Sequence, residues 1–292
     1  MNGKRILVTG KNSYIGVSVK KWLKDKKQYD CIDEVCVKNS AWQDLDFSVY
    51  DAVFHVAGLA HSDTGHATEQ TKALYYEVNT HLTLEVAKKA KSEGVRQFIF
   101  MSSMIVYGDS SPLGIKKRIT KETLPSPANF YGDSKLQAEI GLSDLEAENF
   151  KIAVIRPPMI YGKGSKGNYP KLATLAKKLR IFPHIENERS MLHIDNLCEF
   201  VHLIIKNEDR GTFHPQNKTY VTTSHLVAEI ARIHGKKIYL TPFFNLFLKV
   251  VAKHGKTLNK MFGSLSYDMA LSIYQEDYRV RTFEESIELT EK

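Results

Sequence analysis

The first half of the chain alternates short apolar runs with amphipathic stretches, and this alternation constrains the fold more than any other feature. Apolar runs that indicate buried strands lie at residues 5–8, 35–37, 52–57, 98–101 and 152–155. Stretches that indicate helices lie at 14–26, 73–92 and 129–148. Strands that alternate with helices are typical of a parallel sheet covered by helices. The sequence therefore predicts an α/β fold with a doubly wound parallel sheet.

The pattern becomes less regular after residue 158. A glycine-rich loop at 162–167 precedes a basic helical stretch at 170–179, and further helical stretches lie at 224–234 and 244–254. At roughly 100 to 200 residues per domain, a chain of 292 residues suits one large domain or two unequal ones. We therefore expect a smaller, mixed lobe after the parallel sheet.

Composition and charge exclude several other kinds of protein. Hydrophobic residues make up 42% of the chain and charged residues 25%, which excludes a disordered or fibrous chain. The net charge of +8 favours anionic ligands such as phosphates, and the basic residues are too dispersed to predict a nucleic-acid-binding face. Three cysteines without a CxxC or histidine cluster indicate neither a disulfide framework nor a metal site. With no signal peptide and no bilayer-spanning stretch, we expect a cytoplasmic protein.

The turn after the first strand carries a candidate phosphate-binding loop. Strand 5–8 runs into the string TGKNSYIG at 9–16 and then into a helix. Gly10 permits a tight turn, Gly16 lets the helix pack closely, and the helix N-terminus offers free N–H groups to a pyrophosphate. An ordinary strand-to-helix turn is the simpler alternative, but the position on the first strand favours a dinucleotide. The predicted contacts are Gly10, Asn12, Ser13, Tyr14, Ile15 and Gly16.

A candidate catalytic group lies at the start of the helix predicted at 129–148. Tyr131 and Lys135 are four residues apart, so both project from one helix face. A nearby ammonium group favours the phenolate and should lower the pKa of the Tyr131 phenol from about 10. Spacing alone favours a simpler explanation, an exposed tyrosine beside a solvated lysine. Ser103 follows strand 98–101, at the sheet edge where open α/β sheets bind ligands, whereas we expect Ser102 to cap a turn.

Seven motifs in this order resemble the extended short-chain dehydrogenase/reductase family, in its branch of nucleotide-sugar epimerases, dehydratases and reductases. The motifs are TGxxxxxG at 9–16, FHVAG at 54–58, Asn79, SSxxVYG at 102–108, YxxxK at 131–135, RP followed by IYG at 156–162, and Arg189 before LHID at 192–195. The resemblance spans almost the whole chain. It implies a Rossmann-type dinucleotide-binding domain at 1–156, rejoined by about 189–212, and a substrate-binding lobe at 157–188 and 213–292.

The resemblance also implies a role for each matching residue. Ser103 aligns with the catalytic Ser/Thr, Tyr131 with the acid/base, and Lys135 with the lysine that binds the nicotinamide ribose. Arg189 aligns with an arginine that contacts the phosphates of the nucleotide. Further implied cofactor contacts are Lys38, Ala57, Gly58, Asn79, Tyr131, Lys135 and Pro158, and the implied substrate contacts are Ser103, Tyr131, Asn168 and Arg189.

Three departures from the family pattern refine these expectations. Ser13 replaces the middle glycine of the phosphate loop, which is tolerable if its backbone keeps φ below zero. Met104 and Ile105 follow Ser103 where the family's 4,6-dehydratases have an Asp-Glu pair, so dehydration is disfavoured. Lys38 lies where an acidic residue would bind the ribose 2′-hydroxyl of NAD, which favours NADP(H) over NAD(H) unless this lysine is simply solvent-facing.

The favoured function is reduction of the C4 ketone of a UDP-4-keto-6-deoxy-(N-acetyl)hexosamine with NAD(P)H, in the synthesis of capsule or O-antigen polysaccharide precursors. Residues 156–195 look most like bacterial surface-polysaccharide enzymes that act on UDP-N-acetylhexosamines. A UDP-hexose or UDP-N-acetylhexosamine 4-epimerase with tightly bound NAD is the alternative, and a non-catalytic dinucleotide-binding sensor is a remote one. The sugar and the nucleotide base stay open.

The expected partner is a UDP-sugar, with no nucleic acid. The stretch at 242–260 combines aromatic and aliphatic residues with lysines, which is compatible with a basic amphipathic helix on a membrane surface. Packing of this stretch within the substrate lobe is favoured. A homodimer is left open.

Overall fold

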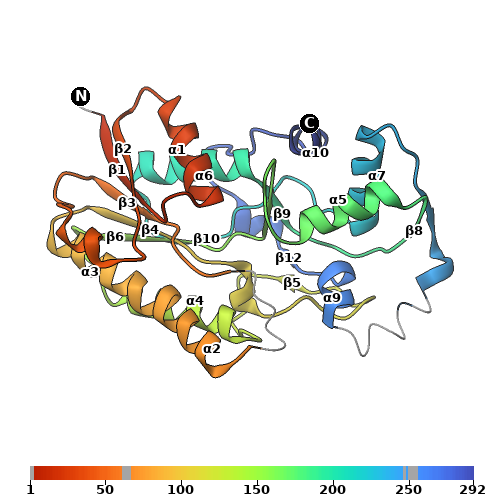
Figure 1. The fold of residues 1–292 in the computed structure, drawn as a ribbon, viewed down its shortest axis with the longest axis horizontal. Coiled ribbons are helices and arrows are strands. Elements are labelled where there is room, and N and C mark those ends of the chain that lie inside the picture. The colour runs from red at the N-terminus through yellow and green to blue at the C-terminus, as the bar shows by residue number, and fades with distance from the viewer. Residues whose placement is uncertain (1–2, 61–66, 246–247, 249–255) are drawn as a thin grey trace. The chain divides into compact units, whose positions relative to one another are not determined.

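The computed structural model describes residues 3–60, 67–245, 248 and 256–292 (Figure 1). The chain forms two compact units. The first unit consists of Met1–Gly108, Pro125–Pro157 and Leu197–His214, and the second of Asp109–Leu124, Pro158–Asn196 and Pro215–Lys292. Each unit has its own apolar core.

The first unit is built on a parallel sheet of six strands. The strands are β1 (Lys4–Thr9), β2 (Tyr29–Val35), β3 (Ala52–His55), β4 (Gln97–Met101), β6 (Lys151–Ile155) and β10 (Gly211–Phe213), in the order β10-β6-β4-β3-β1-β2. Every residue of β3 and β4 is buried, as expected for central strands covered on both faces. The predicted doubly wound parallel sheet is confirmed.

Helices cover both faces of this sheet (Figure 1). They are α1 (Tyr14–Lys24), α2 (Glu69–Tyr76), α3 (Leu82–Ser92), α4 (Phe130–Ser143) and the greater part of α6 (Ile194–Asn207). The single helix predicted at 73–92 is instead α2 and α3 joined by a π-helical turn at Glu77–His81. Such turns often mark functional positions, and Asn79 lies within this one.

The sequence placed the second strand of the sheet at the wrong residues and did not predict β10. The second strand was expected at 35–37, but β2 pairs with β1 in parallel from Tyr29 to Val35. Its sequence, YDCIDEV, holds one buried residue, Ile32, because β2 lies at the edge of the described sheet. A search for a continuous apolar run therefore misses it. A 3₁₀ helix at Ser40–Asp44 is the only helical or strand segment between β2 and β3.

The second unit holds short strands and peripheral helices. Its strands are β5 (Arg118–Ile119), β7 (Met159–Tyr161), β8 (Ile181–Pro183), β9 (Met191–His193), β11 (Tyr239–Thr241) and β12 (Ser266–Tyr267), paired as β11-β8, β12-β5 and β7-β9. Its helices are α5 (Asn168–Lys178), α7 (Thr223–Ile233), α9 (Lys256–Phe262) and α10 (Phe283–Glu291). The sequence placed residues 109–124 and 189–196 with the first domain. The structure groups both segments with the second unit, because β5 pairs with β12 and β9 pairs with β7.

The structure tests the expectations about membrane contact only in the described residues. No helix among these residues is long and apolar enough to cross a bilayer. Within the stretch 242–260, for which an amphipathic helix was considered, residues 246–247 and 249–255 lie outside the described residues. Most of the helix expected at 244–254 also lies outside the described residues.

Candidate active site

The loop after β1 has the tight geometry of a phosphate-binding turn. Gly10 adopts a φ of +93°, and a Cβ at this position would lie 2.9 Å from the backbone nitrogen of Ala57. Asn12 also takes a positive φ, +64°, which the sequence did not single out, although asparagine tolerates this region better than most residues. The loop is therefore held against the end of β3, and its backbone cannot accept a side chain at Gly10.

Ser13 is the N-cap residue of helix α1, so the serine has a structural role in the loop. Its φ is −72°, as the serine-for-glycine replacement requires, and its Oγ accepts a hydrogen bond of 3.1 Å from the Gly16 N–H. A Cβ on Gly16 would lie 2.7 Å from that oxygen, so only glycine fits there. The first turn of α1 contains no acidic residue, which leaves its N-terminus suited to an anion.

Tyr131 and Ser103 come from neighbouring turns of the first unit. Asn129 caps α4, so Tyr131 lies in its first turn, and Ser103 caps the 3₁₀ helix at Met104–Tyr107 that follows β4. The two side chains share a hydrogen bond, and the Tyr131 ring packs edge-on against Tyr75 at 5.9 Å. The structure thus brings the predicted acid/base and the predicted hydroxyl together.

Lys135 lies one turn further along α4 and is almost completely buried. Its Nζ donates a 2.9 Å hydrogen bond to the Met101 carbonyl and lies 4.6 Å from the centre of the Phe100 ring. Burial lowers the pKa of Lys135 to about 8, although the Glu139 carboxylate opposes this effect. An ammonium group with this pKa is still mostly protonated at neutral pH.

The expected effect of Lys135 on Tyr131 is not observed. The sequence predicted that the ammonium group lowers the pKa of the phenol, but burial raises it, with the Ser103 hydrogen bond opposing. In this arrangement Nζ of Lys135 is directed to a backbone carbonyl instead. The phenol of Tyr131 is therefore held in its protonated, proton-donating form.

Gly58 packs closely against Lys135 and Asn79. A Cβ on Gly58 would lie 3.0 Å from both Lys135 Nζ and Asn79 Oδ1, so a side chain here would crowd both groups. Asn79 is fully buried and bonds the backbone N–H and carbonyl of Leu59 at 2.8 and 3.1 Å, which fixes the chain after Gly58. Together with the α1 N-terminus, these residues suit a dinucleotide with its ribose near Lys135.

The low pKa of Lys135 predicts an unusual pH dependence of stability. The unfolded chain holds this proton up to pH 10.5, whereas the folded chain loses it near pH 8. Between these values the unfolded state binds more protons, so the free energy of unfolding should rise with pH, by on the order of 2 kcal/mol from Lys135 alone. Urea unfolding of the cofactor-free protein measures this rise. It should be smaller in Lys135→Met and unchanged in a control, Lys88→Met, at an exposed lysine of α3; an equal rise in both variants would contradict the assignment.

A buried polar network lies behind the catalytic group, and the sequence did not identify it. Glu139, one turn beyond Lys135 on α4, accepts hydrogen bonds from Ser102 Oγ and from Arg156 Nη2, the latter at 2.5 Å. Arg156 Nη1 donates to the Tyr107 hydroxyl at 2.5 Å, and that oxygen contacts His214 Nε2 at 2.9 Å. The repeated four-residue spacing of Tyr131, Lys135 and Glu139 was the signal available. Ser102 thus bonds a buried carboxylate rather than only capping a turn.

Four further predicted site residues belong to none of the groups described so far. Lys38 is exposed, three residues beyond the end of β2, and Pro158, Asn168 and Arg189 belong to the second unit. Arg189 is buried, and its Nη1 donates to the carbonyls of Lys260, Met261 and Gly263 at 2.8, 3.4 and 3.3 Å. Burial lowers the pKa of its guanidinium to about 10. In this arrangement Arg189 satisfies carbonyl groups at the C-terminal end of α9.

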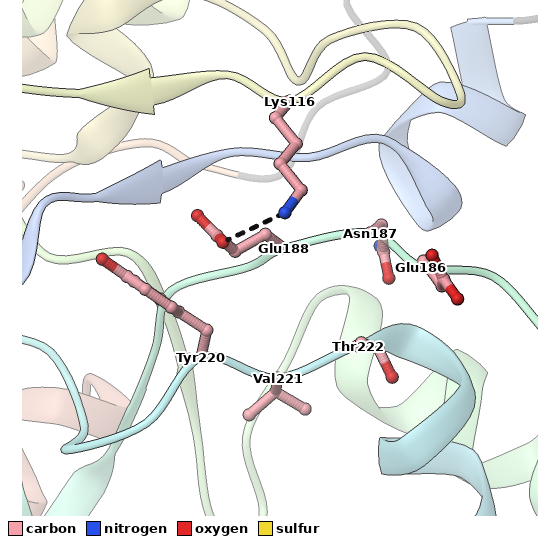
Figure 2. A pocket seen from close by; sticks show the side chains of 7 residues that line it. All are labelled: Lys116, Glu186, Asn187, Glu188, Tyr220, Val221 and Thr222. Atoms are coloured by element: carbon pink, nitrogen blue, oxygen red, sulfur yellow. Dashed lines mark ion pairs between the residues drawn. The ribbon is translucent and has the colours of Figure 1, made fainter.

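A cavity of about 210 Å³ in the second unit is lined by Lys116, Glu186, Asn187, Glu188, Tyr220, Val221 and Thr222. Figure 2 shows Lys116 and Glu188 directed toward each other, with Nζ and Oε2 3.9 Å apart. Glu188 also binds Arg118 at 2.7 Å. Ordinary small-molecule sites occupy roughly 300–1,000 Å³, so this cavity is too small to hold a whole nucleotide sugar. Among the described residues, no group of His, Cys, Asp and Glu side chains could hold a metal ion.

Comparisons with known proteins match the chain over most of its length. A family model described as "NAD dependent epimerase/dehydratase family" matches residues 6–220. A UDP-glucose 4-epimerase of Vibrio cholerae is 30% identical over 295 residues, covering 91% of this chain and 88% of the relative. An N-acetyl-alpha-D-glucosaminyl-diphospho-ditrans,octacis-undecaprenol 4-epimerase of Escherichia coli O157:H7 is 33% identical over 174 residues, or 57% of this chain and 51% of the relative.

Solved structures share the fold at lower identity. A UDP-glucuronic acid 4-epimerase from Bacillus cereus in complex with NAD superposes with a TM-score of 0.73 at 15% identity, over 98% of this chain and 97% of that one. A dTDP-4-dehydrorhamnose reductase from Bacillus anthracis in complex with NADP gives a TM-score of 0.67 at 20% identity, over 82% and 83% of the two chains. At these identities the likeness extends to the fold alone.

Proposed function

The chain belongs to the NAD dependent epimerase/dehydratase family, and from this premise we propose that it is a nucleotide-sugar reductase that uses NADPH. The family's enzymes are NAD(P)-dependent nucleotide-sugar epimerases and reductases of the extended short-chain dehydrogenase/reductase type. The proposed substrate is a UDP-4-keto-6-deoxy-(N-acetyl)hexosamine whose C4 ketone becomes an alcohol. The proposed setting is the synthesis of capsule or O-antigen precursors.

The carboxyl end of β2 is the observation that carries this proposal. The N–H groups of Gly10 and Lys11 donate to the Val35 carbonyl, which places the end of β2 beside the phosphate loop. The residues that follow, Cys36, Val37 and Lys38, include no carboxylate to accept a ribose 2′-hydroxyl. The two acidic residues nearest the end of the strand already have partners, since Glu34 pairs with Lys20 at 2.8 Å and Asp33 accepts from the Tyr50 hydroxyl at 2.8 Å. Lys38, an exposed cation shortly after the end of the strand, suits the 2′-phosphate of NADPH.

The catalytic residues suit addition of hydrogen to a ketone. NADPH, when bound, supplies the hydride that adds to C4. The Tyr131 phenol donates its proton to the ketone oxygen, so C=O becomes CH–OH, and solvent returns a proton to the phenolate. Ser103 donates a hydrogen bond to the same oxygen, and Lys135 contacts the ribose beside Gly58. The raised pKa of Tyr131 supports this direction, because reduction needs the phenol and sugar oxidation needs the phenolate.

Dehydration is disfavoured by the residues after Ser103. Met104 is buried, and neither it nor Ile105 carries a group that can exchange a proton with the sugar. Water loss at C5 and C6 of a sugar needs such groups. The 6-deoxy-4-keto sugar must therefore be supplied by a separate dehydratase reaction.

A change at Lys38 tests the preference for NADPH. Lys38→Ala should raise the KM for NADPH about tenfold and leave the KM for NADH unchanged, because one charge-assisted contact to the 2′-phosphate is lost. Initial rates with each cofactor measure both constants. The matched control is Lys88→Ala, which removes an exposed lysine of α3 and should change neither KM. Equal changes in the KM for NADPH and for NADH in Lys38→Ala would contradict the proposed preference for NADPH.

A 4-epimerase is the second candidate, and one observation favours it. The V. cholerae relative that matches 91% of this chain is a UDP-glucose 4-epimerase. An epimerase would use Ser103, Tyr131 and Lys135 in both directions around a retained NAD. Analysis of the purified protein after acid release of bound nucleotides separates the candidates. The reductase is expected to contain little cofactor and to need added NADPH, whereas stoichiometric NAD with interconversion of UDP-hexoses would favour the epimerase.

A further inference from the structure

Six large apolar side chains are exposed on two short segments of the second unit. They are Leu179, Ile181, Tyr239, Leu240, Phe243 and Phe244. We refer to all of them except Leu240 as the aromatic patch, because Leu240 is paired with the buried Phe182 and so lies on the other face of its strand pair. The exposed fraction reaches 82% at Phe243 and 60% at Tyr239. Single exposed apolar residues are ordinary on a protein surface, but a contiguous group marks an interaction site.

Strand pairing brings the two segments of the aromatic patch side by side. β8 and β11 form a two-stranded parallel sheet in which Tyr239 is paired with Ile181. The next residue of β8, Phe182, is buried and contacts Phe262, so Ile181 and its partner Tyr239 face the opposite, exposed side. The position of β8 is labelled in Figure 1.

The aromatic tip of the patch is held in a defined turn. Pro242–Phe244 form a 3₁₀ turn capped by Thr241, whose Oγ1 accepts from the Phe243 N–H at 3.2 Å. Phe243 and Phe244 contact each other edge to face at 5.4 Å. Asn245 Nδ2 donates to the His184 carbonyl at 2.8 Å, which ties the turn to the end of β8. The exposed rings are therefore presented by ordered backbone.

Basic residues surround the aromatic patch, and acidic residues are absent from its two segments. Residues 177–184 and 235–245 contain no Asp or Glu. The exposed basic side chains of these segments are Lys177, Lys178, Arg180, Lys236 and Lys237. Lys177 pairs with Glu291 at 2.8 Å, and Lys237 lies 5.2 Å from the centre of the Tyr239 ring. The two segments thus combine exposed apolar side chains with an excess of positive charge.

We propose that the aromatic patch and the exposed basic residues of its two segments dock this protein on an anionic lipid surface. Aromatic rings favour the interfacial zone between headgroups and acyl chains, and lysine and arginine favour the negative headgroups. The aliphatic residues Leu179 and Ile181 distinguish this surface from a nucleic-acid site, because they offer no ring for a base to stack on. Docking of this kind needs no membrane-spanning segment. It is independent of whether the enzyme reduces or epimerises its sugar.

Vesicle co-sedimentation tests this proposal directly. The full-length protein is mixed at low salt with vesicles of phosphatidylcholine alone, or of phosphatidylcholine and phosphatidylglycerol in equal parts. It should pellet with the anionic vesicles only, and salt should weaken the binding. Lys178→Gln combined with Lys237→Gln should weaken binding about 25-fold, since each lysine near a charged membrane contributes about fivefold. Phe243→Ser should also weaken binding while the salt dependence persists.

A matched control keeps the test decisive. Lys218 and Ile273 are exposed in the same unit outside the patch, so Lys218→Gln with Ile273→Ser removes similar side chains there and should bind like the wild type. All the altered residues are exposed, so thermal melting and turnover of the soluble substrate should match the wild type in every variant. Failure to bind anionic vesicles would overturn the proposal. Equal losses in patch and control variants would overturn it too, as would binding to single-stranded RNA or to an acidic protein without vesicle binding.

Discussion

Tyr131→Phe is expected to lower turnover by about 10²- to 10⁴-fold while leaving cofactor affinity nearly unchanged. General acid catalysis typically contributes a factor of this size, and the substitution removes only the hydroxyl that delivers the proton. The ring keeps its packing against Tyr75, so the fold should be preserved. Steady-state rates measure turnover, and quenching of protein fluorescence by NADPH measures affinity.

The neighbouring tyrosine provides the control for this prediction. Tyr75→Phe removes a hydroxyl from a buried ring at 5.9 Å from Tyr131 and should leave turnover within a few-fold of the wild type. Ser103→Ala should fall between the two, because it removes a hydrogen bond to the oxygen and not the proton itself. Turnover of Tyr131→Phe close to that of Tyr75→Phe would show that another group supplies the proton.

Arg156→Met is expected to destabilise the first unit by about 3–5 kcal/mol. Arg156 and Glu139 are both largely buried, with 11% and 7% of their side chains exposed. Removing the guanidinium leaves the Glu139 carboxylate buried without its cationic partner, although Ser102 still donates to it. The cost is that of an uncompensated buried charge rather than the value of the pair itself.

Urea unfolding followed by tryptophan fluorescence measures the loss of stability in the first unit. Trp22 and Trp42 are the only tryptophans, and both lie in the first unit. Arg96→Met is the control, since Arg96 is an exposed residue of the same unit that pairs with Asp51 at 2.7 Å and its loss should hardly move the midpoint. The double variant Glu139→Leu/Arg156→Met should recover part of the lost stability, because no unpaired charge remains. A double variant less stable than Arg156→Met would contradict this explanation.

The sheet could be predicted because its central strands are buried on both faces. β3 and β4 show in the sequence as continuous apolar runs, and the helices between them show the helical period. β2 could not be found in this way, because an edge strand with one buried residue carries no such run. The π-helical turn at Asn79 leaves no trace in periodicity either, since it shifts the helix by a single residue.

The candidate site, too, could be predicted from the sequence only where its residues are close together in the chain. Gly10, Gly16, Tyr131 and Lys135 were recognisable because their spacing is local. Lys135 and Arg189 bond to backbone carbonyls that are distant in the sequence, at Met101 and at Lys260–Gly263. No residue pattern predicts those contacts. The sequence showed Glu139 only as a residue four positions after Lys135, in line with Tyr131. Its role as a buried ionic partner became clear only from the position of Arg156.

Transfer of deuterium from labelled NADPH tests net ketone reduction, the central claim, most directly. The purified protein is incubated with a UDP-4-keto-6-deoxy-N-acetylhexosamine and NADPH carrying deuterium at the reactive position of the nicotinamide, and the product is analysed by NMR. One deuterium at C4 of the product is expected for each NADPH consumed, and Tyr131→Phe should transfer it about 10²- to 10⁴-fold more slowly. Conversion of UDP-hexoses without added cofactor, with no deuterium in the product and no NADPH consumed, would contradict the central claim.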